Sequence, residues 1–143
     1  MINIAIDGPA GAGKSTVAKA VAKKLGILYL DTGAMYRAMA LKAMREGIDP
    51  NDKEQVLPLL EYTEIYAKNI GGTQHTYLDG EDVSGLIRTP EISRGASDIS
   101  AIPEVRIKLA QIQRNIAHTS DVVMDGREIG SYVIPECENK FYV

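Results

Sequence analysis

Cysteine, histidine and long apolar runs are scarce in this chain of 143 residues. Cys137 is the only cysteine, which excludes an intramolecular disulfide and is typical of a protein of the reducing cytoplasm. No apolar run approaches the length of a membrane span, and the N-terminus lacks a signal-peptide pattern. His75 and His118 stand apart from any cluster with metal-ligand spacing, so we interpret both as surface or turn residues. The sequence thus predicts a cytoplasmic protein without a membrane partner.

A strong charge of either sign is also missing, because the net charge is only −3. This balance argues against broad binding of nucleic acid, and an anionic substrate would have to be captured by local positive charge. The content of 45% apolar and 24% charged residues is typical of a globular protein with a core of its own. No Ser/His/Asp or Cys/His arrangement is apparent. Phosphoryl transfer needs neither, since it depends on positioning, a metal ion and positive charge.

A phosphate-binding loop is the most specific pattern present. Residues 8–15 read GPAGAGKS and fit G-x-x-x-x-G-K-[ST]. Isoleucines alternate along residues 2–6, which predicts a strand before the loop, and apolar residues at helical spacing follow it. Such a turn directs backbone N–H groups and a helix N-terminus at phosphate. We predict that a nucleoside triphosphate, which the family resemblance described below implies is ATP, is bound by Gly8, Pro9, Ala10, Gly11, Ala12, Gly13, Lys14, Ser15 and Thr16.

Within this loop, Lys14 is expected to contact the β- and γ-phosphates as a catalytic residue, and the Ser15 hydroxyl to ligate Mg²⁺. A second candidate ligand, and a further predicted catalytic residue, is Asp125, at the end of a predicted strand over residues 122–124. A carboxylate there can hold Mg²⁺ directly or through water. The alternative interpretation of Asp125 is a turn-forming residue before glycine.

Two arginines are candidates for a second phosphate site. Arg37 lies one helical turn after Thr32, and Arg127 comes two residues after the strand that ends at Asp125. Both are expected at the carboxyl edge of a parallel sheet, where α/β proteins bind ligands. Two guanidinium groups would hold a phosphate by bidentate bonds, although each alone could be a solvated surface residue. Arg127 is also a predicted catalytic residue.

The predicted elements describe an α/β protein with an insert. Residues 1–31 form strand, loop, helix and strand, and helices follow over 34–46, around 53–60, and from Pro90 and Pro103. Residues 63–84 predict a small antiparallel sheet, and 141–143 a further strand. We expect a three-layer fold whose core is residues 1–31 and 118–143, with an insert over 32–117 that the family resemblance described below implies is a monophosphate-binding one. Ser97 and Arg106 form either a hydrogen-bonding pair for a flat polar ligand or ordinary helix surface.

Other classes of protein with this loop fit less well. A signalling GTPase carries Asp-x-x-Gly after its metal strand, whereas Glu128 stands at that glycine here. The segment Asn139-Lys140-Phe141-Tyr142 does not complete the Asn-Lys-x-Asp guanine reader. A motor or helicase ATPase normally needs a longer chain and oligomeric partners. The pattern therefore favours a kinase for a small substrate.

The chain resembles the bacterial cytidylate kinase family. The resemblance rests on residues 6–15 (IDGPAGAGKS), 31–37 (DTGAMYR), 82–84 (DVS) with 87–89 (IRT), and 124–130 (MDGREIG). It implies a monomeric, Mg²⁺-dependent enzyme that phosphorylates CMP and dCMP with ATP. It also implies that Thr32, Arg37 and Arg127 hold the acceptor nucleotide, while Ser97, Arg106 and Glu128 read the cytosine edge.

Two departures from the family pattern matter. The family usually has Asp where this chain has Glu128, and the extra methylene moves a carboxylate that reads the base. Family members are also longer, so we expect the chain to continue into an arginine-rich lid. Without a lid to exclude water, the segment alone should have little kinase activity. The alternatives are a kinase for another monophosphate or a hydroxyl substrate, and a non-catalytic nucleotide-binding module.

Overall fold

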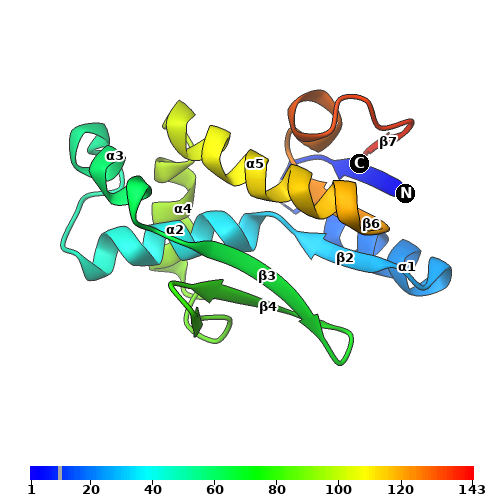
Figure 1. The fold of residues 1–143 in the computed structure, drawn as a ribbon, viewed down its shortest axis with the longest axis horizontal. Helices are drawn as coiled ribbons and strands as arrows, with labels where there is room; N and C mark the ends of the chain where they lie inside the picture. Colours follow the sequence, from blue (N-terminus) through cyan, green and yellow to red (C-terminus); the bar gives the residue numbers. More distant parts are fainter. Residues whose placement is uncertain (10) are drawn as a thin grey trace. The chain divides into compact units, whose positions relative to one another are not determined.

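The computed structural model describes residues 1–9 and 11–143. The chain divides into two compact units: residues 1–32 with 110–143, and residues 33–109. Helix α5 (Pro103–Thr119) continues without a break across the second boundary (Figure 1). None of the helices in the described part of the chain is long and apolar enough to cross a membrane.

The first unit is built on a four-stranded parallel sheet with the order β2-β6-β1-β7. Its strands are β1 (Asn3–Asp7), β2 (Leu28–Asp31), β6 (Val122–Gly126) and β7 (Asn139–Tyr142). β1 and β6 are neighbours in register from Asn3 opposite Val122 to Asp7 opposite Gly126. Since parallel strands end at the same edge, the loops after β1, β2 and β6 leave the sheet together.

Helix α1 (Lys14–Leu25) packs against this sheet through small residues (Figure 1). Ala18 and Ala22, at i and i+4, meet Ile4 and Ile6 of β1 and Val123 of β6 in one buried cluster. The helix ends at Gly26, whose φ of 68° is the left-handed conformation that glycine adopts at little cost. The predicted order of strand, loop, helix and strand is therefore confirmed.

The second unit combines helices with a small antiparallel sheet. Its elements are α2 (Gly33–Arg45), α3 (Lys53–Glu61), β3 (Ile65–Ile70), β4 (Thr73–Leu78), β5 (Glu81–Asp82), α4 (Pro90–Ile99) and the first turns of α5. Helices α2 and α4 approach closely at Gly95, because a Cβ there would lie 3.3 Å from the Cβ of Ala40. Thr89 caps α4 by accepting a hydrogen bond from the amide of Ile92.

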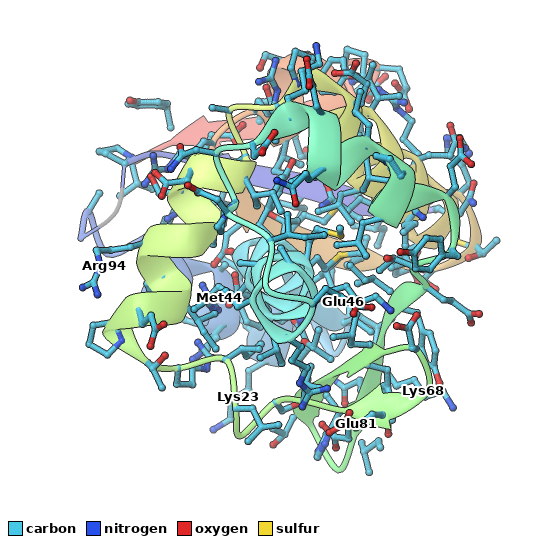
Figure 2. The ribbon with its side chains drawn as sticks, turned by 90° about the vertical axis from the view of Figure 1, so that its left-hand side faces the viewer. Lys23, Met44, Glu46, Lys68, Glu81 and Arg94 are labelled. Atoms are coloured by element: carbon cyan, nitrogen blue, oxygen red, sulfur yellow. The ribbon has the colours of Figure 1, made fainter. Side chains whose placement is uncertain are left out.

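The sheet of the second unit has the order β3-β4-β5, as the turn and strand pattern predicted. Tyr66 and Tyr77 are opposite one another and stack with their ring centroids 4.9 Å apart. The ammonium of Lys68 lies 5.5 Å from both rings. On β5, Glu81 forms an ion pair with Arg45 of α2. Figure 2 labels Lys68 on β3 and Glu81 on β5. The fold class predicted for the chain is confirmed.

A hydrogen-bonded network closes the turn after β5. The Asp82 carboxylate accepts from both the amide and the hydroxyl of Ser84, at 3.0 and 2.7 Å, and contacts Nδ1 of His75 at 2.7 Å. Ser84 in turn accepts from the amide of Thr76. His75 thus contacts one carboxylate, because β4 and β5 bring it against Asp82, and among the described residues it belongs to no group of three metal-ligating side chains. The hydrogen bonds from Ser84, and then that from His75, lower the pKa of Asp82 from 3.8 to about 2.

The network predicts a pH-dependent contribution to stability. Because the pKa of Asp82 is lower in the folded chain, its ionised form stabilises the fold above pH 3.8, and this contribution is lost as the pH falls towards about 2. Asp82→Asn should thus lower the urea midpoint near neutral pH but not near pH 2. A carboxyl ¹³C titration gives the pKa directly, and a value of Asp82 near 3.8 in the folded chain would contradict the account.

Candidate functional site

The phosphate loop connects β1 to the first turn of α1. Gly11 and Gly13 have φ values of 79° and 86°, in the left-handed region that side chains disfavour. Gly13 is the N-cap of α1 and brings no side chain to cap it, so the first-turn amides face the loop. Lys14 is the first residue of the helix and Ser15 is exposed. Ala10, one of the predicted ATP-binding residues, lies outside the described residues.

Asp125 lies at the end of β6 and is buried, with 3% of its surface exposed. Its Oδ2 accepts a hydrogen bond of 2.6 Å from the hydroxyl of Tyr29. Its backbone oxygen accepts from the hydroxyl of Thr32, at 2.7 Å. The register of β2 with β6 sets Asp31 opposite Asp125, so two carboxylates come together at this edge.

Burial raises the pKa of Asp125 from 3.8 to about 6. The hydrogen bond from Tyr29 opposes this shift, while the nearby negative charge of Asp31 adds to it. The positive charges of Lys14 and Lys19 lower the pKa, which places the lysine of the loop within electrostatic range of the carboxylate. A buried carboxylate with a raised pKa at a strand end is typical of a functional site.

The chain turns tightly after Asp125. A Cβ on Gly126 would lie 2.7 Å from the Thr32 hydroxyl oxygen and 2.8 Å from Cδ1 of Ile129, closer than side chains tolerate. Arg127 then is exposed and Glu128 half-buried, and Glu128 is the N-cap of the π-helix η1 (Ile129–Val133). π-helical turns of this kind are frequent at functional sites.

Gly126→Ala should therefore destabilise the chain. The added methyl group would displace Thr32 or Ile129 from its place, which should lower the free energy of unfolding by about 1–3 kcal/mol. Gly85→Ala is the matched control, since a Cβ there meets nothing within 4 Å, and its effect should stay within about 1 kcal/mol. Urea unfolding measures both, and equal effects of the two substitutions would contradict the close packing at Gly126.

Three of the predicted site residues belong to the second unit. Arg37 is half-buried on α2, and Ser97 is exposed on α4. Arg106, on α5, donates to the backbone oxygen of Ser100 at 3.3 Å, and the hydroxyl of Ser100 donates to the backbone oxygen of Ser97. Lys14, Ser15, Thr32, Asp125, Arg127 and Glu128 belong to the first unit. That the site residues of the two units bind the same nucleotide together stays a prediction.

Two residues of the first unit were missed by reasoning from the sequence. Tyr29 holds Asp125, and Asp7 accepts hydrogen bonds from the amides of Ile129 and Gly130. The position of Asp7 directly before the phosphate loop was a signal of its importance. Its partners lie 122 and 123 residues away, and only the pairing of β1 with β6 brings them together.

A parallel sheet, a glycine-rich loop at a helix N-terminus and a buried carboxylate on the adjacent strand define a nucleotide-binding α/β protein of the phosphate-loop class. A family model described as cytidylate kinase matches residues 4–143. The chain belongs to the cytidylate kinase family.

Curated relatives agree with the family model. The chain is 54% identical over 142 residues to a protein of Caldicellulosiruptor saccharolyticus named cytidylate kinase, with 99% of the chain covered. It is 52% identical over 141 residues to the cytidylate kinase of Symbiobacterium thermophilum, and 47% identical over 143 to that of Lactobacillus johnsonii, with 98% and 100% of the chain covered. The chain spans 63%, 62% and 62% of the length of these three relatives.

Proposed function

We propose that the chain provides the donor and acceptor sites of an enzyme that phosphorylates CMP and dCMP with ATP by direct in-line transfer. The observation that carries this proposal is the common edge at which the loops after β1 and β6 leave the parallel sheet. One loop has the pattern of a triphosphate site, and the other presents Arg127 and Glu128. Family membership supports the same reaction, since the relatives are named cytidylate kinase.

On the donor side, Lys14 and the backbone amides of residues 8–16 would hold the phosphates of ATP. The Ser15 hydroxyl and the Asp125 carboxylate would hold Mg²⁺, which supplies charge neutralisation on the transferring phosphoryl group. These residues fit the ion, because Mg²⁺ prefers oxygen ligands and is bound by one or two protein groups together with phosphates. Lys14 already lies close enough to lower the pKa of Asp125, as expected for groups that share one site.

On the acceptor side, Thr32, Arg37 and Arg127 would hold the monophosphate, with Ser97, Arg106 and Glu128 at the cytosine. The 32–117 segment would then be the monophosphate-binding insert, and its helices and antiparallel sheet support that role. The guanidinium of Arg127 would also stabilise charge on the transferring group, as arginine does in phosphoryl transfer. We also propose that the enzyme works as a monomer. We place it in the cytoplasm, a location that its single cysteine supports.

Separate binding of donor and acceptor tests this assignment. Lys14→Met should weaken ATP binding by about tenfold or more and leave CMP binding intact, and Arg127→Met should do the reverse. Isothermal titration calorimetry measures both affinities in each variant. Arg94→Met is the control, because Arg94 is exposed on α4 and Figure 2 shows its side chain extending away from that helix.

The assignment would be wrong if Lys14→Met and Arg127→Met weakened the same nucleotide, or if Arg94→Met matched either of them. A chain that binds ATP but none of the monophosphates would support the non-catalytic nucleotide-binding module instead.

The choice of base is tested by comparing four monophosphates. CMP and dCMP should bind more tightly than UMP, because a carboxylate at Glu128 accepts from the amino group of cytosine and finds no amino group on uracil. AMP carries an amino group too, and its weaker binding is expected from membership of the cytidylate kinase family. Glu128→Gln should reduce the preference for CMP over UMP by about tenfold. Preferred binding of AMP would overturn the base assignment and favour a kinase for another monophosphate.

A further inference from the structure

We infer that Asp7 is a positioning residue that fixes the segment with Arg127 and Glu128 for the acceptor nucleotide. This inference rests on the proposed function, since it assigns Asp7 to the acceptor site although Asp7 directly precedes the donor loop. Asp7 fixes this segment through two backbone amides, those of Ile129 and Gly130, and not by contact with the nucleotide.

Both oxygens of the Asp7 carboxylate take part. Oδ1 accepts from the amide of Ile129 at 2.8 Å, and Oδ2 accepts from the amide of Gly130 at 2.9 Å. Both distances are those of well-formed N–H···O hydrogen bonds. Bonds that a carboxylate accepts from backbone N–H groups are about twice as strong as bonds between neutral groups. Next to them, the amide of Gly8 donates to the backbone oxygen of Gly126 at 3.1 Å. Asp7 and Gly8 thus hold the last residue of β6 and the first two residues of η1 by three hydrogen bonds.

The amides that Asp7 binds are the first two of η1. The first N–H groups of a helix have no partner within it, and the Asp7 carboxylate accepts from two of them here. The turn itself is closed by the amides of Tyr132 and Val133, which donate to the backbone oxygen of Glu128 at 2.9 and 3.1 Å. Asp7 therefore supplies the hydrogen-bond acceptors for the first two amides of η1, which begins directly after Glu128.

The other end of η1 is held by an arginine. Arg114 of α5 donates from Nε to the backbone oxygen of Val133 at 2.7 Å, and from a terminal nitrogen to that of Tyr132 at 2.9 Å. Its guanidinium also lies 5.1 Å from the centroid of the Tyr132 ring. The Asp7 carboxylate at the first residues and the Arg114 guanidinium at the last residues therefore fix η1 at both ends.

The consequence concerns the two residues between β6 and η1. Arg127 and Glu128 lie between Gly126, which packs against Thr32 and Ile129, and Ile129, which Asp7 holds. Their backbone has little freedom, so their side chains start from a defined position. A preorganised arginine and carboxylate bind a nucleotide at a lower entropic cost than mobile ones do. Asp7 would therefore contribute to acceptor affinity without touching the acceptor.

The test compares Asp7→Asn with Asp121→Asn. An asparagine keeps the shape of Asp7, but its amide group turns a donor towards one of the two N–H groups and so loses that bond. Asp121 offers a matched control, because its carboxylate accepts from the amide of Ile2 at 2.7 Å at the opposite end of the strand pair. Amide hydrogen exchange is measured without nucleotide, and CMP and ATP affinities are measured by calorimetry.

Asp7→Asn should speed exchange at Ile129 and Gly130 by about tenfold or more and weaken CMP binding by a similar factor. ATP binding should change by less than about twofold, and Asp121→Asn should show neither effect. Unchanged exchange at both amides would overturn the inference, as would equal losses of ATP and CMP affinity, which indicate damage to β1 as a whole.

A measurement without substitution covers the case in which Asp7→Asn does not fold. In the wild-type chain, scalar couplings through hydrogen bonds should join the amide nitrogens of Ile129 and Gly130 to the side-chain carboxyl carbon of Asp7. Their absence would overturn the inference. If the wild-type chain binds no CMP while the couplings and the exchange effect are present, the proposed function fails and the hydrogen bonds of Asp7 to η1 stand.

Discussion

The parallel pairing of β1 with β6 is the constraint on which the rest of the first unit depends. It aligns Asp7 with Gly126, so the phosphate loop and the segment containing Arg127 and Glu128 leave the sheet at one edge. A shift of this register by one residue would turn Asp125 to the other face of the sheet. It would also separate the Asp7 carboxylate from the two amides of η1.

The pairing of β6 with its other neighbour, β2, helps to explain why a carboxylate is tolerated at this edge. Asp125 is buried at 3% exposure, yet its carboxylate accepts a hydrogen bond from Tyr29 and lies near the charge of Lys14. An ionised carboxylate without such partners would be costly to bury. Burial raises the pKa of Asp125 despite these partners, and a cation bound beside Asp125 would favour the ionised form.

The sequence predicted those features that depend on neighbouring residues. The glycines and Lys14 define the phosphate loop, and the spacing of apolar residues predicts α1. The turn signals Gly71-Gly72 and Asp79-Gly80 mark the antiparallel sheet. The bonds of Asp7 to Ile129 and Gly130, of Tyr29 to Asp125 and of His75 to Asp82 were not predictable in this way. Each joins separate elements, and a single sequence shows where strands begin but not which side chains the sheet brings together. The strand predicted at 141–143 is present as β7, which begins earlier, at Asn139.

The central claim is that two loops at one edge of the sheet bind two different nucleotides. Amide chemical-shift mapping of the chain with Mg²⁺-ATP, and then with CMP, tests it most directly. The account predicts that ATP shifts the amides of residues 11–16, and that CMP added afterwards shifts those of residues 127–130 without displacing ATP. CMP that competes with ATP for the amides of the phosphate loop, or that leaves residues 127–130 unchanged, would contradict it.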